Sequence, residues 1–242
     1  MIPNDKPTKI KTLDLGVGPG TWSLRLFDLF TDSIDITGID ISEGLLELAR
    51  SNISEYEKNR NISTSISLKV SDLNKDLPFD NNTFDLTICT NTPLNHIRQS
   101  NIESVVSNML RVTKSGGYNI TSVKSEGSLP TVYVCPMSDV LTYTQENDIL
   151  SFTHKNGQKA RLISNLFTLD KLKNLFGKFG KTEFIGVGIF LPRFETYYWP
   201  NHDFEKYLNP VMEELEALEK KYSKDSRFID LANHIMVITK KD

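Results

Sequence analysis

Residues 13–20 read Leu13-Asp14-Leu15-Gly16-Val17-Gly18-Pro19-Gly20, and this stretch decides the fold. An apolar run over residues 10–15 leads into three glycines at alternate positions, and an apolar-periodic run over residues 22–30 follows them. This order predicts a strand, a glycine-rich turn and a helix. Glycines in such a turn let the backbone approach a ligand that a Cβ would push away. The spacing G-x-G-x-G differs from the G-x-G-x-x-G that cradles a pyrophosphate in dinucleotide enzymes.

The alternation of strand and helix continues through the first half of the chain. We predict strands at the following residues: 34–39, 65–70, 84–89 and 118–123. Ser42 is a credible N-cap for a helix after the second strand, and residues 102–113 form another helix, which Ser115-Gly116-Gly117 is expected to end with a left-handed C-cap. Strands alternating with helices imply helices on both faces of a sheet, so we predict a doubly wound α/β fold with a mostly parallel, seven-stranded sheet.

Beyond residue 123 the pattern becomes antiparallel. Residues 150–154 and 159–163 alternate in polarity, and Asn156-Gly157 between them predicts a type I′ hairpin turn. We interpret residues 124–167 as an inserted β flap. The core pattern then returns with a helix at 168–179 and a strand at 182–190. Residues 191–226 follow with an aromatic loop and a charged helix at 209–222, and the last strand is at 234–239.

We therefore expect a single domain over residues 1–242. Residues 1–123 form its ligand-binding half, and residues 168–242 form a C-terminal half that contains a lid segment at 191–226. A chain of this length can bury one large core.

Composition excludes several classes of protein. The net charge is -3 and the sequence pI is about 5.9, which argues against a nucleic-acid partner because such binding leaves a basic footprint. No apolar run is long enough to cross a bilayer, and the first residues lack the apolar core of a secretory signal, so we expect a cytoplasmic protein. Cys89 and Cys135 are too few for a disulfide framework and are not spaced as metal ligands, so we expect no structural metal.

Further motifs follow the first one in a recognisable order. Acidic residues stand two positions before Gly16, at the end of the second strand (Asp40) and in Val70-Ser71-Asp72-Leu73. Phe84 to Cys89, Leu94-Asn95-His96-Ile97 and the stretch from Arg111 to Gly117 come next. In this order and content the chain resembles the class I S-adenosylmethionine-dependent methyltransferases, small-molecule type. The resemblance covers residues 10–123, about half the chain.

The resemblance implies that S-adenosylmethionine is the cofactor and S-adenosylhomocysteine the product. It assigns the following residues to cofactor binding: Asp14, Gly16, Gly18, Gly20, Asp40, Ile41, Asp72, Leu73, Cys89 and Thr90. Asp40 would accept hydrogen bonds from both ribose hydroxyls, and Asp72 would meet the adenine amino group. Asp14, a carboxylate inside an apolar strand, needs donors such as loop amides or the cofactor's ammonium. The alternatives are a plain tight turn, a helix-capping Asp40 and a loop acid at Asp72.

Two groups of residues are candidates for the chemistry. His96 follows the fourth strand near the carboxyl edge of the sheet, where it could act as a general base or serve only local structure. The predicted loop after residue 190 supplies the candidate substrate-binding residues: Arg193, Tyr197, Tyr198, Trp199 and His202. Aromatic faces can hold a cationic amine and arginine can clamp a carboxylate, whereas packing of a lid would explain the same aromatics.

The expected activity is transfer of a methyl group, by in-line displacement, to an oxygen or nitrogen of a small molecule or short peptide. One alternative is a cofactor-binding or partner subunit without catalysis. Another is a nicotinamide-dependent oxidoreductase, which the glycine spacing and Asp72 disfavour. The first motif begins only about ten residues from Met1, where many relatives have a helical cover, so we hypothesise that the flap and residues 191–226 form the lid. Alternatively, a second chain could cover the cofactor in place of the N-terminal helix. A homodimer is also possible on the sequence alone.

Overall fold

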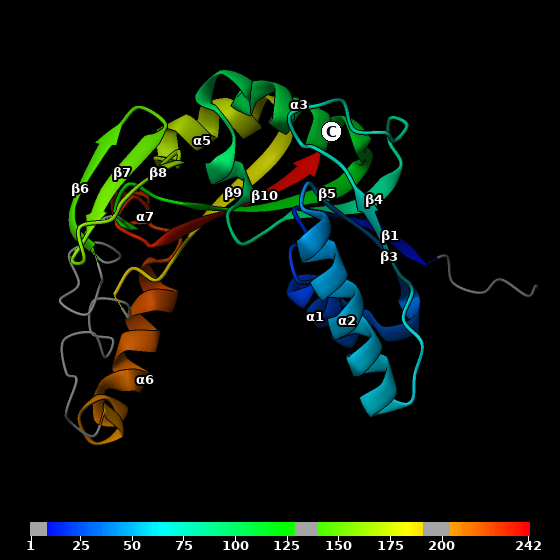
Figure 1. The fold of residues 1–242 in the computed structure, drawn as a ribbon, viewed down its shortest axis with the longest axis horizontal. Helices are drawn as coiled ribbons and strands as arrows, with labels where there is room; N and C mark the ends of the chain where they lie inside the picture. Colours follow the sequence, from blue (N-terminus) through cyan, green and yellow to red (C-terminus); the bar gives the residue numbers. More distant parts are fainter. Residues whose placement is uncertain (1–8, 129–139, 191–203) are drawn as a thin grey trace, which may run out of the picture.

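The structure is a computed structural model that describes residues 9–128, 140–190 and 204–242, and its centre is a seven-stranded sheet (Figure 1). The strand order is β3-β2-β1-β4-β5-β10-β9. The bounds are β1 (Ile10–Leu15), β2 (Ile34–Asp40), β3 (Ile66–Val70), β4 (Phe84–Cys89), β5 (Thr113–Lys124), β9 (Gly180–Val187) and β10 (His234–Lys241). Within this sheet, among the described residues, only the pairings of β10, with β5 and with β9, are antiparallel. The predicted fold class is confirmed.

Helices lie on both sides of this sheet. Helices α1 (Thr21–Phe30) and α2 (Glu43–Arg60) lie on one side, and α3 (Ile102–Val112) and α5 (Leu169–Phe176) on the other (Figure 1). Ser42 caps α2 as predicted, because its hydroxyl accepts a hydrogen bond from the Leu45 N–H at 3.3 Å. Near the C-terminus follow α6 (Phe204–Tyr222) and α7 (Ser226–Ile229). No helix in these ranges has the length and apolar character needed to cross a membrane.

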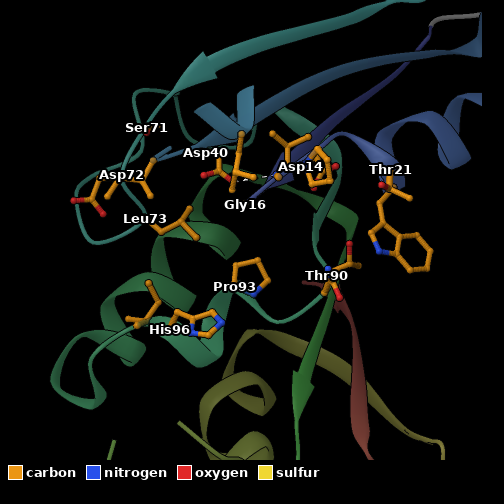
Figure 2. A pocket seen from close by; sticks show the side chains of 18 of the residues that line it. Asp14, Gly16, Thr21, Asp40, Ser71, Asp72, Leu73, Thr90, Pro93 and His96 are labelled. Carbon is orange, nitrogen blue, oxygen red and sulfur yellow. Dashed lines mark hydrogen bonds between the residues drawn. The ribbon is translucent and has the colours of Figure 1, made fainter. Parts of the chain in front are cut away.

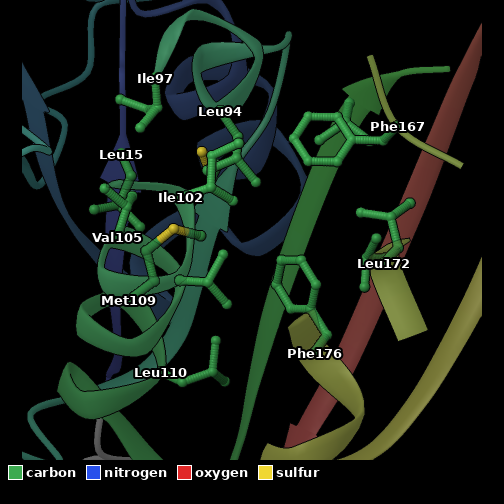
Figure 3. Packing of buried hydrophobic residues seen from close by; sticks show 14 of the residues in the cluster. Leu15, Leu94, Ile97, Ile102, Val105, Met109, Leu110, Phe167, Leu172 and Phe176 are labelled. Carbon is green, nitrogen blue, oxygen red and sulfur yellow. The ribbon is translucent and has the colours of Figure 1, made fainter. Parts of the chain in front are cut away.

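The main hydrophobic core fills the space between the sheet and helices α3 and α5. Figure 3 shows Val105, Met109 and Leu110 of α3 near Leu172 and Phe176 of α5. A smaller cluster on the opposite side joins Phe27 of α1 to Ile34 and Ile36 of β2, with Tyr56 of α2 against it. Burial of both faces explains why the central strands read as nearly continuous apolar runs.

The inserted segment forms a separate three-stranded antiparallel sheet, made of β6 (Val140–Glu146), β7 (Ile149–His154) and β8 (Lys159–Ile163). The predicted hairpin between β7 and β8 is confirmed, but its turn type is wrong. The Gly157 N–H donates to the His154 carbonyl at 2.9 Å and the His154 N–H donates to the Gln158 carbonyl at 2.7 Å. Gly157 has a positive φ of 85° whereas Asn156 does not. This is the longer hairpin with glycine in the left-handed position, not type I′.

The predicted glycine C-cap of α3 is also wrong. The helix ends at Val112, and Thr113 is already extended as the first residue of β5. The Thr113 hydroxyl is buried and donates to the Met109 carbonyl at 2.8 Å, which satisfies the last turn without glycine. Gly116, with a φ of 75°, lies inside β5, close to where the pairing with β4 shifts register.

Other boundaries differ at the C-terminal half. Strand β9 ends at Val187, α6 begins five residues before the predicted start, and the short α7 was not predicted. The candidate substrate residues Arg193, Tyr197, Tyr198, Trp199 and His202 lie outside the described residues, as does part of the expected lid.

Replacement of Phe176 by alanine tests the main core. Phe176 is fully buried, so Phe176→Ala should lower the free energy of unfolding by about 3–5 kcal/mol. Leu29→Ala is the control, because Leu29 is 76% exposed and its loss should change stability by no more than about 0.5 kcal/mol. Urea unfolding followed by circular dichroism measures both; equal effects would contradict the assigned core.

Candidate functional site

A cavity of about 670 Å³ lies at the carboxyl ends of β1, β2 and β4, a volume within the range of small-molecule sites (Figure 2). The structure brings most of the predicted site residues to its wall: Asp14, Gly16, Gly18, Asp40, Ile41, Asp72, Leu73, Thr90 and His96. Gly20 and Cys89 do not line it. Residues that sequence reasoning did not assign, Trp22, Arg25 and Pro93, also line the cavity.

The loop after β1 is held against the end of β2. The N–H groups of Gly16 and Val17 both donate to the Ile39 carbonyl, at 2.8 and 2.9 Å. Gly16 has a φ of 75°, and a Cβ at this position would lie 2.5 Å from the Pro93 ring. Gly16 therefore permits the close approach of the β1 loop to the segment that follows β4.

The next two glycines have different roles. Gly18 lines the cavity with a φ of 52°, and a Cβ built there would meet no atom within 4 Å. The missing side chain leaves free space inside the cavity. Gly20, with a φ of 82°, packs against Ala49 of α2, where a Cβ would lie 3.4 Å from the Ala49 Cβ. The predicted contact of Gly20 with the cofactor thus finds no support in the cavity wall.

Asp40 joins the loop after β1 to the start of α2. One carboxylate oxygen accepts from the Gly18 N–H at 3.0 Å, and the other from the Ser42 N–H at 2.9 Å. Each oxygen of a carboxylate has two lone pairs, so each keeps one for a further donor. The side chain is only 9% exposed, and it lines the cavity. Asp40 can therefore accept two hydrogen bonds from a vicinal diol.

Asp72 lies at the cavity edge after β3. Its Oδ1 accepts from the Asn74 N–H at 2.9 Å and from the Asn74 side-chain amide at 3.0 Å. The backbone hydrogen bond from Asn74 is the main cause that lowers the pKa of Asp72 below its ordinary value. The group is thus an ionised acceptor beside Leu73, whose apolar side chain also lines the cavity (Figure 2).

Asp14 is buried in β1, with 2% of its surface exposed. Its Oδ2 accepts from the Ser23 hydroxyl at 2.7 Å. Burial raises the pKa of Asp14 from 3.8 to about 7, the Ser23 hydrogen bond opposes this rise, and the nearby Asp40 adds to it. A cationic group in the cavity would stabilise the ionised form, so the site favours a positively charged ligand.

The segment after β4 forms another part of the wall. Thr90 is 8% exposed and its hydroxyl has no hydrogen-bond partner among the described residues. Asn91 and Thr92 both have positive φ values, 60° and 73°, a conformation that costs energy for a β-branched threonine. The Cys89 side chain is instead fully buried in the core, where burial raises the pKa of its thiol to about 12. The thiol is therefore inert, and Thr90 is the residue that faces the cavity.

His96 is exposed on the cavity wall near Pro93 (Figure 2). Its Nδ1 lies 3.0 Å from the Ile163 carbonyl oxygen, at the end of β8. Because a carbonyl only accepts, Nδ1 carries the proton of this hydrogen bond, and the neutral ring keeps a lone pair on Nε2. The imidazole can therefore accept a proton at Nε2.

The geometry thus combines a glycine-lined recess, an acceptor carboxylate suited to a diol and a buried acid suited to a cation. Residues 12–117 match the family described as a methyltransferase domain. Over these residues, a little under half of the chain, the sequence is similar to methyltransferase domains. The matched residues include the whole cavity wall.

Curated relatives that match about half of this chain are named demethylmenaquinone methyltransferases. That of Shouchella clausii is 31% identical over 49% of this chain and 46% of its own length. That of Staphylococcus aureus is 28% identical over 50% of this chain and 46% of its own length. The match therefore spans less than half the length of these relatives and is confined to about half of this chain.

Solved structures extend the likeness beyond this half. The PH0226 protein of Pyrococcus horikoshii is 26% identical, with a TM-score of 0.58 over 75% of this chain and 78% of its own. A protein of Methanosarcina mazei titled as a member of the SAM-dependent methyltransferases has 20% identity and a TM-score of 0.57 over 75% of this chain and 86% of its own. The second likeness concerns the fold alone.

The raised pKa of Asp14 predicts a pH-dependent stability of the ligand-free protein. The folded state binds a proton up to a pH of about 7, whereas the unfolded chain releases it near 3.8, so this contribution to stability is lost as the pH rises between these values. Asp14→Asn should remove that loss. Urea unfolding at several pH values measures the difference between the two proteins, and parallel pH profiles would contradict the assignment.

Proposed function

We propose that the protein transfers a methyl group from S-adenosylmethionine to an oxygen or nitrogen atom of a small molecule or short peptide. The observation that carries the proposal is the cavity in which the open backbone at Gly18 meets the carboxylates of Asp40 and Asp14. S-adenosylmethionine has a ribose diol that suits Asp40 and an ammonium group that suits Asp14, and the open backbone at Gly18 leaves room for it.

The cofactor contacts follow from the donors and acceptors on the wall. Asp40 accepts from the ribose hydroxyls with its two remaining lone pairs, and Asp72 accepts from the adenine amino group. Asp14 neutralises the cofactor's ammonium, which in turn holds Asp14 ionised. Gly18 leaves room for the ligand beside the loop. Ile41, which is 65% exposed, and Leu73 offer apolar contacts to the adenine ring.

When bound, the cofactor supplies an activated methyl group on a positively charged sulfur. The protein must then hold the acceptor atom in line with that group and remove its proton. His96 is the proposed proton acceptor, because Nε2 has a free lone pair and the ring lines the cavity. His96 Nε2 would take the proton that the acceptor atom loses as it accepts the methyl group.

The acceptor molecule is proposed only by class. The acidic pI of about 5.9 favours a small molecule or peptide over RNA. The name of the curated relatives does not identify the acceptor, since they match only about half of this chain. Arg193, Tyr197, Tyr198, Trp199 and His202 stay predictions for acceptor binding. Residues 1–242 are proposed to form a single domain in which 124–167 is an insertion.

Transfer of label tests the proposal directly. The purified protein, incubated with methyl-labelled S-adenosylmethionine and a cell extract, should pass label to a small molecule or peptide that mass spectrometry identifies. S-adenosylhomocysteine should also raise the melting temperature, whereas NAD should not. Stabilisation without label transfer would instead support a cofactor-binding subunit, and stabilisation by NAD alone would support an oxidoreductase.

Gly18→Ala tests the recess. The new Cβ would enter the cavity, so the affinity for S-adenosylhomocysteine should fall at least about 10-fold, a loss of about 1.4 kcal/mol. Gly116→Ala is a matched control: Gly116 also has a positive φ and open space around its missing Cβ, but it lies outside this cavity. Both variants should lose about 1–2 kcal/mol of stability from the left-handed backbone. Calorimetry should find weakened S-adenosylhomocysteine binding only in Gly18→Ala. Equal affinities of the two variants would refute the proposal that the ligand occupies the space beside Gly18.

A further inference from the structure

A seam of hydrogen bonds joins the end of β8 to the segment that carries His96. The Asn165 N–H donates to the Asn95 carbonyl at 2.7 Å, and the Asn95 side-chain amide donates to the Asn165 carbonyl. The Asn165 side-chain amide donates to the Ile97 carbonyl. His96 Nδ1 adds the hydrogen bond to the Ile163 carbonyl. Each of residues 95–97 is thus hydrogen-bonded to the segment 163–165.

Both asparagines of this seam are buried, with 1% of Asn95 and 6% of Asn165 exposed. Asn95 also anchors the seam to the main sheet: its Oδ1 accepts from the Lys124 N–H at 3.0 Å, and its amide donates to the Lys124 carbonyl at 3.3 Å. A buried amide such as that of Asn95, whose oxygen and nitrogen both have partners, favours one arrangement, because moving it leaves a polar group without a partner.

The seam has a chemical consequence for His96. The Ile163 carbonyl selects the tautomer with the proton on Nδ1, and it does so only while residues 163–165 stay next to residues 95–97. We propose that Asn95 and Asn165 are positioning residues, which use the inserted three-stranded sheet to hold His96 with Nε2 as the proton acceptor. This role rests on the proposed function. The insertion would thereby contribute to catalysis through its hold on His96.

A second tie between the insertion and the same loop provides a control. Asp148, in the turn between β6 and β7, accepts from the Gln99 N–H at 3.1 Å. This bond also fastens the insertion to the segment before α3, but it does not involve residues 95–97. Asp148→Ala should therefore reproduce any general loosening of the insertion without altering His96.

A double-mutant cycle on methyl transfer separates positioning from simple stability. His96→Gln should lower kcat at least about 100-fold, and Asn165→Ala about 10- to 100-fold, with S-adenosylhomocysteine affinity within a few fold of the parent. In His96→Gln/Asn165→Ala the two losses should not add, because both remove the same proton acceptor. Asp148→Ala should retain kcat. Additive losses, or an unchanged kcat in His96→Gln, would overturn the proposal.

Nitrogen NMR of the ligand-free protein tests the same point without activity. The sequence has 4 histidines, so the His96 ring can be assigned by comparison with His96→Gln. The parent and Asp148→Ala should show a protonated Nδ1 and a bare Nε2, and Asn165→Ala should show a mixture of tautomers. Asn165→Asp serves if the alanine variant does not fold. An unaltered tautomer would overturn the proposal, whereas absent methyl transfer with the expected NMR result would count against the proposed function alone.

Discussion

The carboxylate of Asp40 fixes the glycine loop after β1 relative to the start of α2. Its two oxygens hold the Gly18 amide of one loop and the Ser42 amide at the start of α2. Both loops leave neighbouring parallel strands at the same edge of the sheet, and the loop after β1 is further fixed on the Ile39 carbonyl. The recess therefore exists before any ligand arrives, and a ligand need not spend binding energy on ordering it.

Three acids around one cavity have three different electrostatic environments. Asp14 is buried and drawn toward its neutral form, Asp72 is stabilised as an anion by Asn74, and Asp40 is shared between two backbone amides. A ligand with a cation at one end and donors at the other satisfies all three. This distribution of charge is a property of strand ends in a parallel sheet, where acids far apart in sequence come together.

The sequence predicted most of the sheet and the half of the site that depends on local motifs. Glycine spacing and acids at strand ends are local signals, so Asp14, Gly18, Asp40 and Asp72 could be assigned to one cavity before its geometry was known. Asn95 and Asn165 could not, because their partnership joins residues 70 positions apart and no pattern marks a buried amide. The turn after β7 was misjudged for a local reason: an Asn-Gly pair fits two hairpin geometries, and backbone pairing decides between them. Trp22 has only a weak signal, since an aromatic residue after the glycine turn also suits core packing.

Strand β10 has a further implication for how the chain reaches its native state. Residues 234–241 form the bridge between β5 and β9, although β9 precedes them by some distance in the sequence. During synthesis β9 precedes β10, which is its only partner among the described strands of the main sheet. The backbone N–H and C=O groups of β9 therefore stay without strand partners until β10 has been made. Until residues 234–241 have been synthesised, the main sheet would thus consist of β1 to β5, and β9 could join it only after β10 has paired with β5.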